Sequence, residues 1–172
     1  MAAKRRPTRA HNCPVSRQQS NARRGTNQTR IGRFSEKNRI YHVNTATHGR
    51  TPIFESLAIG RQVVRALMCE ERCGGSSTLA YVVMPDHLHW LLQINGQRSL
   101  SKSVCIIKSN SARQINAMNK SRQKIWQRGY YDRAIRKEDD LVTIARYIVA
   151  NPLRAGLVES IRDYPLWDAI WL

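Results

Sequence analysis

Acidic residues are scarce in this chain of 172 residues: Asp and Glu number 12 against 29 Lys and Arg, and the formal net charge is +17. Such an excess favours a polyanionic partner, which is usually nucleic acid and less often an anionic membrane surface. The excess is uneven, because residues 1 to 40 contain 11 Lys and Arg and a single acid, Glu36. We interpret residues 1–35 as a basic disordered tail able to contact phosphates, and residues 36–172 as one domain. The alternatives for the tail are a solubilising extension and, on composition, a mitochondrial transit peptide.

Several other features are missing. The sequence has no apolar run of the roughly 18 residues that span a bilayer, and no basic start followed by an apolar segment, so we expect neither a membrane span nor a secretory signal. It has no glycine-rich phosphate loop and no dinucleotide fingerprint, so we expect no nucleotide cofactor. Cysteines are few and scattered, which favours the reducing cytoplasm over a disulfide framework. They are Cys13, Cys69, Cys73 and Cys105.

The remaining residues alternate between strand and helix patterns. Strands are predicted where β-branched and aromatic residues gather, and helices where apolar residues recur every three or four positions. The predicted strands are 39–47, 78–84, 87–94 and 124–135, the last interrupted by a bulge at Gly129, and the predicted helices are 52–69, 101–118 and 138–150. The order β-α-β-β-α-β-α predicts an α+β fold, with a mainly antiparallel sheet flanked by helices. The apolar C-terminal segment is expected to pack on this domain.

Two histidines stand one residue apart in the strand of residues 87–94. Alternate residues of a strand share a face, so His87 and His89 lie on one side and Leu88 and Trp90 on the other. Their Cα atoms are then about 6.5–7 Å apart, close enough for both imidazoles to bind one ion. The pair alone leaves open that both rings bind backbone carbonyls or face solvent. A zinc site completed by the two cysteines of Cys69-x3-Cys73 is a further alternative.

The predicted helix of residues 138–150 offers a second pair of polar groups. Tyr147 lies beside the apolar stripe of this helix, and Asn151 follows one turn later. A phenol could attack a phosphate at the point where an amide oxygen binds a metal ion. The alternatives are a tyrosine at the edge of the core and an asparagine that caps the helix before Pro152, which biases Asn151 away from helical geometry.

Three segments, taken in order, resemble one family. YVVMPDHLHWLL, IWQRGYYDRAIR and ARYIVANPLRAGLV are similar to segments of the REP-associated tyrosine transposases, which belong to the single-tyrosine HUH transposase superfamily. The name HUH describes a His-hydrophobic-His motif, and His87-Leu88-His89 fits it. The resemblance covers residues 39–167 and implies an HUH endonuclease-like fold.

The resemblance also implies an activity. Proteins of this family are metal-dependent endonucleases and strand-transferases that act on single-stranded DNA carrying hairpin-forming repetitive palindromes. Carried over by motif, His87 and His89 are metal ligands, Tyr147 is the nucleophile that forms a covalent 5′-phosphotyrosine, and Asn151 is the third metal ligand. The expected cofactor is Mg²⁺ or Mn²⁺, acting as a Lewis acid. The expected location is the bacterial cytoplasm, in association with the nucleoid.

Other residues near these motifs have candidate roles. Asp86 could orient a histidine, or simply occupy the turn after Pro85. Tyr130 and Tyr131 compete with Tyr147 as nucleophile. Four basic residues are candidates for holding DNA phosphates, namely Arg133, Arg136, Lys137 and Arg154. The alternative function is a catalytically inactive protein that binds structured DNA, and both a monomer and a homodimer are compatible with the sequence.

Overall fold

A computed structural model describes residues 36–136 and 139–172, and the predicted tail, residues 1–35, lies outside them. The described part contains a five-stranded sheet of order β4-β1-β3-β2-β5, in which every neighbouring pair is antiparallel. The predicted α+β class is therefore confirmed. The strands are β1 (Ile40–Ala46), β2 (Ser76–Met84), β3 (His87–Ile94), β4 (Tyr131–Ala134) and β5 (Trp167–Ala169). The α-helices are α2 (Leu57–Arg72), α3 (Leu100–Met118), α4 (Leu141–Val149) and α5 (Asn151–Arg154).

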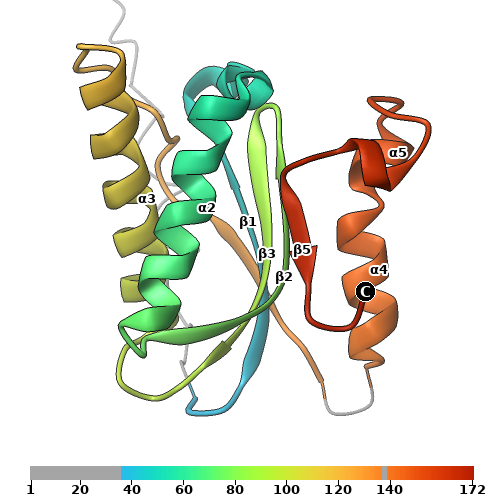
Figure 1. The fold of residues 1–172 in the computed structure, drawn as a ribbon. Coiled ribbons are helices and arrows are strands. Elements are labelled where there is room, and N and C mark those ends of the chain that lie inside the picture. The colour runs from blue at the N-terminus through green and yellow to red at the C-terminus, as the bar shows by residue number, and fades with distance from the viewer. Residues whose placement is uncertain (1–35, 137–138) are drawn as a thin grey trace, which may run out of the picture. The chain divides into compact units, whose positions relative to one another are not determined.

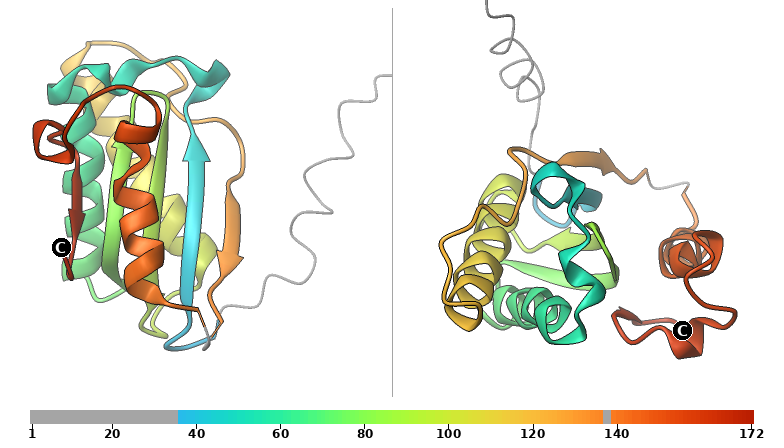
Figure 2. Two further views of the ribbon diagram at one scale, coloured as in Figure 1. Left: turned by 90° about the vertical axis from the view of Figure 1, so that its right-hand side faces the viewer. Right: turned by 90° about the horizontal axis from the view of Figure 1, so that it is seen from above.

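The sheet lies between two helical layers. Helices α2 and α3 cover one face, and α4 lies on the opposite side, as Figure 1 and the view from above in Figure 2 show. Strand β3 is central and pairs with β1 and β2 along its length. Because alternate side chains point to opposite faces, each helical layer covers a different set of β3 residues.

The face toward α2 and α3 is the larger core. It buries Leu88, Trp90, Leu92 and Ile94 of β3, each no more than 1% exposed, together with apolar side chains of both helices. Burying a side chain of this size contributes roughly 1.5–3 kcal/mol, so this row fixes the register of β3 and thereby the direction of its polar positions.

The opposite face carries the second buried cluster. Leu91 of β3 joins Val82 and Met84 of β2 with Ala145 and Ile148 of α4. Helix α4 begins at the Asp140 cap, whose carboxylate accepts hydrogen bonds from the backbone N–H groups of Val142 and Thr143. This helix therefore covers the face of the sheet to which His87 and His89 also belong.

Two predicted boundaries were wrong for tertiary reasons. Helix α2 begins at Leu57 rather than Pro52, because Phe54 is buried in a 3-10 turn and its N–H donates to the Pro85 carbonyl, 2.9 Å away. Only Tyr131–Ala134 of the predicted strand 124–135 pairs with β1. Gly129, with φ of 82°, turns the chain before that strand.

Two further predictions concern the C-terminal region. The predicted helix 138–150 corresponds to α4, which ends at Val149, before Pro152, and Pro152 itself lies at the start of the separate short helix α5. The predicted packing of the C-terminal segment takes the form of β5, which pairs with β2. No helix within the described ranges is long and apolar enough to cross a membrane.

Candidate active site

His87 and His89 lie at the start of the central strand, next to the β2–β3 turn. His89 is 9% exposed, and the His87 side chain is 17% exposed. Their Nε2 atoms are 3.1 Å apart, and their ring centres are 4.8 Å apart with the ring planes at 77°. The distance between the ring centres exceeds the distance between the Nε2 atoms by 1.7 Å. Two rings whose nitrogens pointed straight at each other would differ by two ring radii, which is more. The two Nε2 atoms therefore converge on a point beside both rings.

This convergence fits a shared divalent ion. Two nitrogen ligands bound to one ion at about 2.1 Å and roughly a right angle lie about 3 Å apart. No group of three or more His, Cys, Asp and Glu side chains able to hold a metal ion occurs in the described residues. A site at this pair therefore needs a ligand of another kind, such as an amide oxygen. Both cysteines of the zinc alternative, Cys69 and Cys73, are exposed free thiols, and α2 packs on the other face of the sheet.

Each imidazole has a separate partner at Nδ1. His87 Nδ1 forms a short hydrogen bond with the Asp86 carboxylate, which also accepts one from Arg50 at 3.0 Å. Burial opposes the charge of Asp86, but the hydrogen bonds from His87 and Arg50 outweigh it and lower the pKa of Asp86. With its Nδ1–H directed to a carboxylate, His87 presents the lone pair of Nε2. The predicted orienting role of Asp86 thus has a matching contact.

His89 has an imidazole and an amide as its partners instead of a carboxylate. Its Nδ1 lies 3.1 Å from His42 Nε2 and 3.4 Å from Asn44 Nδ2. Burial, then the charges of His87, His42 and Arg154, lowers the pKa of His89 to about 3. Burial and the charge of Arg133 also lower the pKa of His42. His89 is therefore a neutral imidazole near pH 7, the form that binds metal ions.

His42 and Asn44 were not predicted from the sequence. They alternate with Tyr41 and Val43 in β1, so the period of two places them on one face. Only the register, in which Asn44 lies opposite His89, shows that this is the face of the histidine pair.

Tyr147 lies in the last turn of α4. This end of α4 is at the end of the domain that holds the β2–β3 turn (Figure 1). Neighbouring Ile148 and Val149 are buried against the sheet, whereas Tyr147 is 53% exposed. The Arg154 guanidinium lies 4.2 Å from the centre of its ring, a cation–π contact. The charge of Arg154 also contributes, after burial and the charges of His87 and His42, to lowering the pKa of His89.

Asn151 stands at the junction of α4 and α5. Its Nδ2 group donates hydrogen bonds to the carbonyl oxygens of Tyr147, at 3.2 Å, and Ile148, at 2.8 Å. These bonds tie the amide to the last turn of α4. The Oδ1 atom is the part of the amide that could bind a cation.

The competing tyrosines point to different places. The Tyr130 hydroxyl bonds to Ser101 of α3 at 2.8 Å, on the far side of the sheet from the histidines. Tyr131 is opposite Asn44 in β1, which is in turn opposite His89. With strands about 4.8 Å apart, the Tyr131 and His89 Cα atoms are separated by about 10 Å. Tyr131 therefore shares the histidine face, whereas Tyr130 does not.

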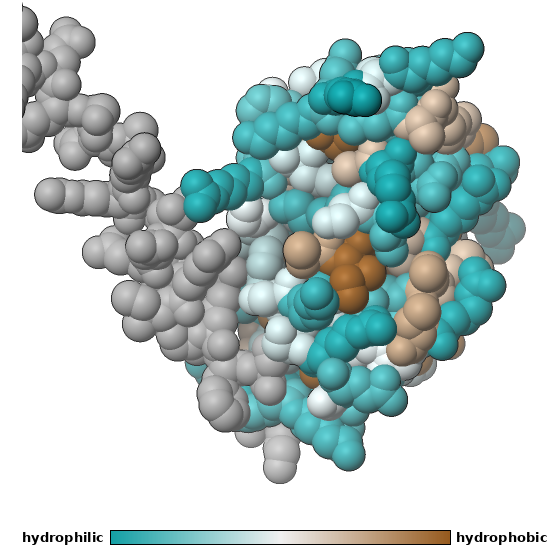
Figure 3. Space-filling model, turned by 90° about the vertical axis from the view of Figure 1, so that its left-hand side faces the viewer, coloured by the Kyte–Doolittle hydropathy of each residue, from teal (hydrophilic) through white to brown (hydrophobic). Residues whose placement is uncertain are grey.

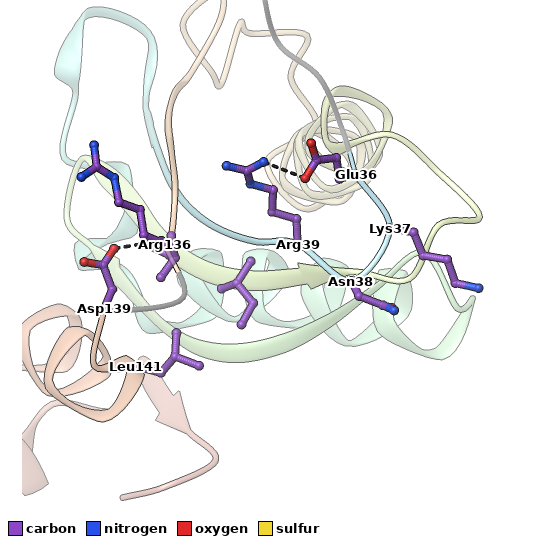
Figure 4. Close-up of a pocket in the computed structure, with 9 residues that line it drawn as sticks. Glu36, Lys37, Asn38, Arg39, Arg136, Asp139 and Leu141 are labelled. Carbon is purple, nitrogen blue, oxygen red and sulfur yellow. Dashed lines mark hydrogen bonds and ion pairs between the residues drawn. The ribbon is translucent and has the colours of Figure 1, made fainter.

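The four basic candidates are also dispersed. Arg133 lies opposite His42 and forms an ion pair with Asp139 at 3.3 Å, and Arg154 lies on Tyr147. Arg136 lines a cavity of about 570 Å³ with Ile40 and Leu141, shown in Figure 4. This cavity is at the other end of the strands, because Ile40 pairs with Gln93 rather than with the residues near His87. Lys137 lies outside the described residues.

A second basic surface follows α3 and was not predicted from the sequence. Residues 99–131 contain seven Lys and Arg and no Asp or Glu, a signal visible in the sequence. Lys102, Arg113, Lys120, Arg122, Lys124 and Arg128 are exposed. Figure 3 shows this side of the domain as mainly hydrophilic, with small apolar areas. Helix α3 itself packs on the face of the sheet opposite to the histidine pair.

Comparisons with known proteins place the chain in a family. The sequence model of the family described as "Transposase IS200 like" matches residues 35–151, more than half of the chain. A protein assigned as a REP-associated tyrosine transposase in Haemophilus influenzae is 34% identical over 98 residues, covering 51% of this chain and 56% of that protein. The REP-associated tyrosine transposase of Escherichia coli is 32% identical over 88 residues, covering 50% of each. The chain thus aligns with about half the length of these curated relatives.

Solved structures show the same fold. A REP-associated tyrosine transposase bound to a REP hairpin superposes with a TM-score of 0.66 at 23% identity, covering 78% of this chain and 79% of that chain. A protein assigned as a transposase of Deinococcus radiodurans gives a TM-score of 0.50 at 23% identity, covering 68% and 93%. At this level of identity, the likeness establishes the architecture of the sheet and its flanking helices.

Proposed function

Because the chain belongs to the IS200-like transposase family, we propose that it is a metal-dependent endonuclease and strand-transferase that acts on single-stranded, hairpin-forming palindromic DNA. The observation that carries this proposal is the pair of converging Nε2 atoms of His87 and His89, 3.1 Å apart on the face of the sheet that α4 covers. The net charge of +17 supports a DNA partner. The REP hairpin bound to the structural relative supports a hairpin substrate.

Tyr147 is the proposed nucleophile. Its hydroxyl oxygen attacks the phosphorus atom of a phosphodiester, the bond from phosphorus to the 3′ oxygen breaks, and the DNA 5′ phosphate becomes linked to Tyr147. The phenol loses its proton and the departing 3′ oxygen gains one, so a free 3′-OH results. A later attack by a 3′-OH on the phosphotyrosine reverses these changes and joins two strands. The half-exposed position of Tyr147 suits a substrate as large as a DNA strand.

The residues at the histidine pair fit a divalent cation. His87, His89 and the Oδ1 atom of Asn151 would hold Mg²⁺ or Mn²⁺, which supplies a Lewis acid for the phosphate oxygens when bound. Asp86 keeps His87 in the tautomer that presents Nε2. This ligand set has no charge of its own, so negative phosphate oxygens complement it well.

Two arginines would hold the DNA strand at this site. Arg154 keeps its guanidinium against the Tyr147 ring, where it is available to a phosphate oxygen near the attacking hydroxyl. Arg133, exposed on the same face of β4, is placed to contact a neighbouring phosphate.

The test is a covalent adduct. We expect the protein, incubated with Mn²⁺ and single-stranded DNA carrying palindromic hairpins, to form a species of increased mass on a denaturing gel. Tyr147→Phe should abolish this species, because only the attacking oxygen is removed. Tyr131→Phe is the matched control, since Tyr131 also lies on the histidine face, and it should retain the adduct. An adduct that persists in Tyr147→Phe would show that another residue is the nucleophile.

A second candidate function rests on the basic α3 surface, which lies across the sheet from the histidines. A catalytically inactive protein that binds structured DNA could use this surface alone. It would bind hairpins in a salt-sensitive manner, form no adduct with any divalent metal, and be unaffected by His87→Ala. The adduct experiment therefore separates the two functions.

A further inference from the structure

We propose that His42 is a positioning residue for His89: its Nε2 atom accepts a hydrogen bond from the Nδ1–H group of His89 and so keeps the His89 Nε2 lone pair directed at the metal position. The inference rests on the proposed function, because it assigns a role toward the divalent ion. It concerns strand β1, which lies outside the three segments that carry the family resemblance.

The contact is an end-to-end hydrogen bond. His42 Nε2 and His89 Nδ1 are 3.1 Å apart, while the ring centres are 5.3 Å apart with the planes at 26°. The distance between the ring centres exceeds the distance between the two nitrogens by 2.2 Å. This excess is about twice the distance from the centre of an imidazole ring to one of its atoms, as expected when both nitrogens lie on the line between the centres. The two nitrogens therefore point almost directly at each other, as donor and acceptor do, and the rings are not stacked face to face.

The two contacts of His89 differ in this respect. Toward His87, the nitrogens are equally close at 3.1 Å, but the ring centres are only 4.8 Å apart and the planes are at 77°. The Nε2 lone pairs of His87 and His89 are directed at a common point beside the two rings, where a third atom can bind. The contact between His42 Nε2 and His89 Nδ1 instead needs a proton on the line between the two nitrogens. His89 is thus held on one side and open to an ion on the other.

The competing arrangement is weaker. Asn44 could donate from Nδ2 to an unprotonated Nδ1 of His89, which would place the proton on Nε2 and block the metal position. That contact is 3.4 Å long, against 3.1 Å for His42. A neutral imidazole has one N–H group, so the shorter, aligned contact with His42 assigns it to Nδ1.

The two ligands are therefore positioned differently. Asp86 follows the usual pattern, in which a metal-bound histidine donates its other N–H to a carboxylate. His42 performs the same function for His89 without adding a negative charge to a residue that is only 9% exposed. We expect its loss to weaken Mn²⁺ binding about 10–100-fold, the usual effect of removing such a partner.

The test measures Mn²⁺ binding without DNA, from the electron paramagnetic resonance signal of free Mn²⁺. His42→Phe keeps a ring but removes the acceptor, and it should weaken binding by the factor above. His42→Gln can place an amide oxygen near the original Nε2 position, and it should recover most of the affinity. Thermal unfolding followed by circular dichroism confirms that each variant is folded. Wild-type affinity in folded His42→Phe would overturn the inference.

A second measurement needs no substitution at His42. Long-range ¹H–¹⁵N correlation spectra of the metal-free wild type should show the His89 proton on Nδ1, with His89→Gln used to assign the resonances. A proton on Nε2 would overturn the inference.

The outcome also separates this inference from the proposed function. If His89→Ala leaves Mn²⁺ binding unchanged, the metal site itself is wrong. If His89→Ala removes binding while His42→Phe does not, only the role of His42 is wrong. Tyr147→Phe should leave Mn²⁺ binding unchanged in either case.

Discussion

His89 shows how its surroundings define the chemistry of a single side chain. It has a strand position that buries it, an imidazole on each side, and a pKa lowered to about 3 by burial and by His87, His42 and Arg154. A buried histidine without partners would be destabilising. The same residue, neutral and fixed at Nδ1, is a suitable metal ligand.

A dependence of stability on pH follows for the metal-free protein. Between pH 6.5 and about 3, an unfolded histidine binds a proton that folded His89 does not, so the free energy of unfolding falls as the pH is lowered through this window. One such group contributes at most about 1.4 kcal/mol per pH unit. We expect urea unfolding in EDTA to show a shallower loss of stability between pH 6.5 and pH 4 in His89→Gln than in the wild type. Equal slopes would mean that His89 titrates normally in the folded state.

The spacing of residues within one strand predicts which side chains share a face, but it does not predict which neighbouring strand they meet. The spacing of His87 and His89 predicts a shared face, and the structure confirms it. His42 and Asn44 follow the same alternation, but nothing in a single strand indicates which face its partner strand will present. The register between β1 and β3 supplies that information.

At the scale of elements, α4 carries Tyr147 to the histidine face. Its buried stripe of Ala145, Ile148 and Val149 fixes the rotation of the helix against β2, so Tyr147 is left half exposed. The stripe can be predicted from the sequence, because its apolar residues recur with a period of 3.6. The face of the sheet on which the stripe packs cannot be predicted in that way.

Substitution of the stripe should therefore affect both stability and chemistry. We expect Ile148→Ala, at a fully buried position, to lower the free energy of unfolding by about 2–5 kcal/mol. Adduct formation should fall as well under conditions where the variant remains folded, because the neighbouring Tyr147 is less firmly placed. Arg146→Ala, on the exposed side of the same helix, should change stability by about 0.5 kcal/mol or less. Urea unfolding monitored by circular dichroism tests both, and equal effects would contradict the packing of α4 on the sheet.

Other elements show why local patterns mislead. Residues 124–130 have the composition of a strand, yet Trp126 is buried against Phe54 and donates from Nε1 to Ser111 Oγ at 3.0 Å. The segment forms one isolated β-bridge, between Trp126 and Thr47, the residue that follows β1. Tertiary burial of an aromatic side chain here outweighs the local strand preference.

At the scale of the domain, positive charge is present on both sides of the sheet. Arg133 and Arg154 lie on the histidine side, and the α3 surface lies on the other. Because each phosphate contact releases counterions, the salt dependence of binding reports how many cations the DNA contacts.

This gives a prediction about where the DNA lies. The double variant Arg133→Ala/Arg154→Ala should lower the slope of log affinity against log salt concentration by up to about 2 for a hairpin with a single-stranded flank. The matched variant Arg113→Ala/Arg122→Ala removes two exposed charges from the α3 side. If the DNA strand follows the histidine face, this variant should lower the slope by less than the Arg133→Ala/Arg154→Ala variant does. Fluorescence anisotropy from 50 to 200 mM salt measures both. The reverse order would place the main DNA contact on α3.

The sequence alone predicts the α+β class, the shared face of His87 and His89, the amphipathic helix that bears Tyr147, and the excess of positive charge. These properties depend on periods of 2 and 3.6 residues and on composition, which are local. Tertiary contacts were needed to show that β1 lies beside β3, that α4 covers the histidine face, and that His42 meets His89 end to end. Such facts depend on register and on which buried surfaces meet, because those contacts join residues far apart in the chain whose pairing no local pattern specifies.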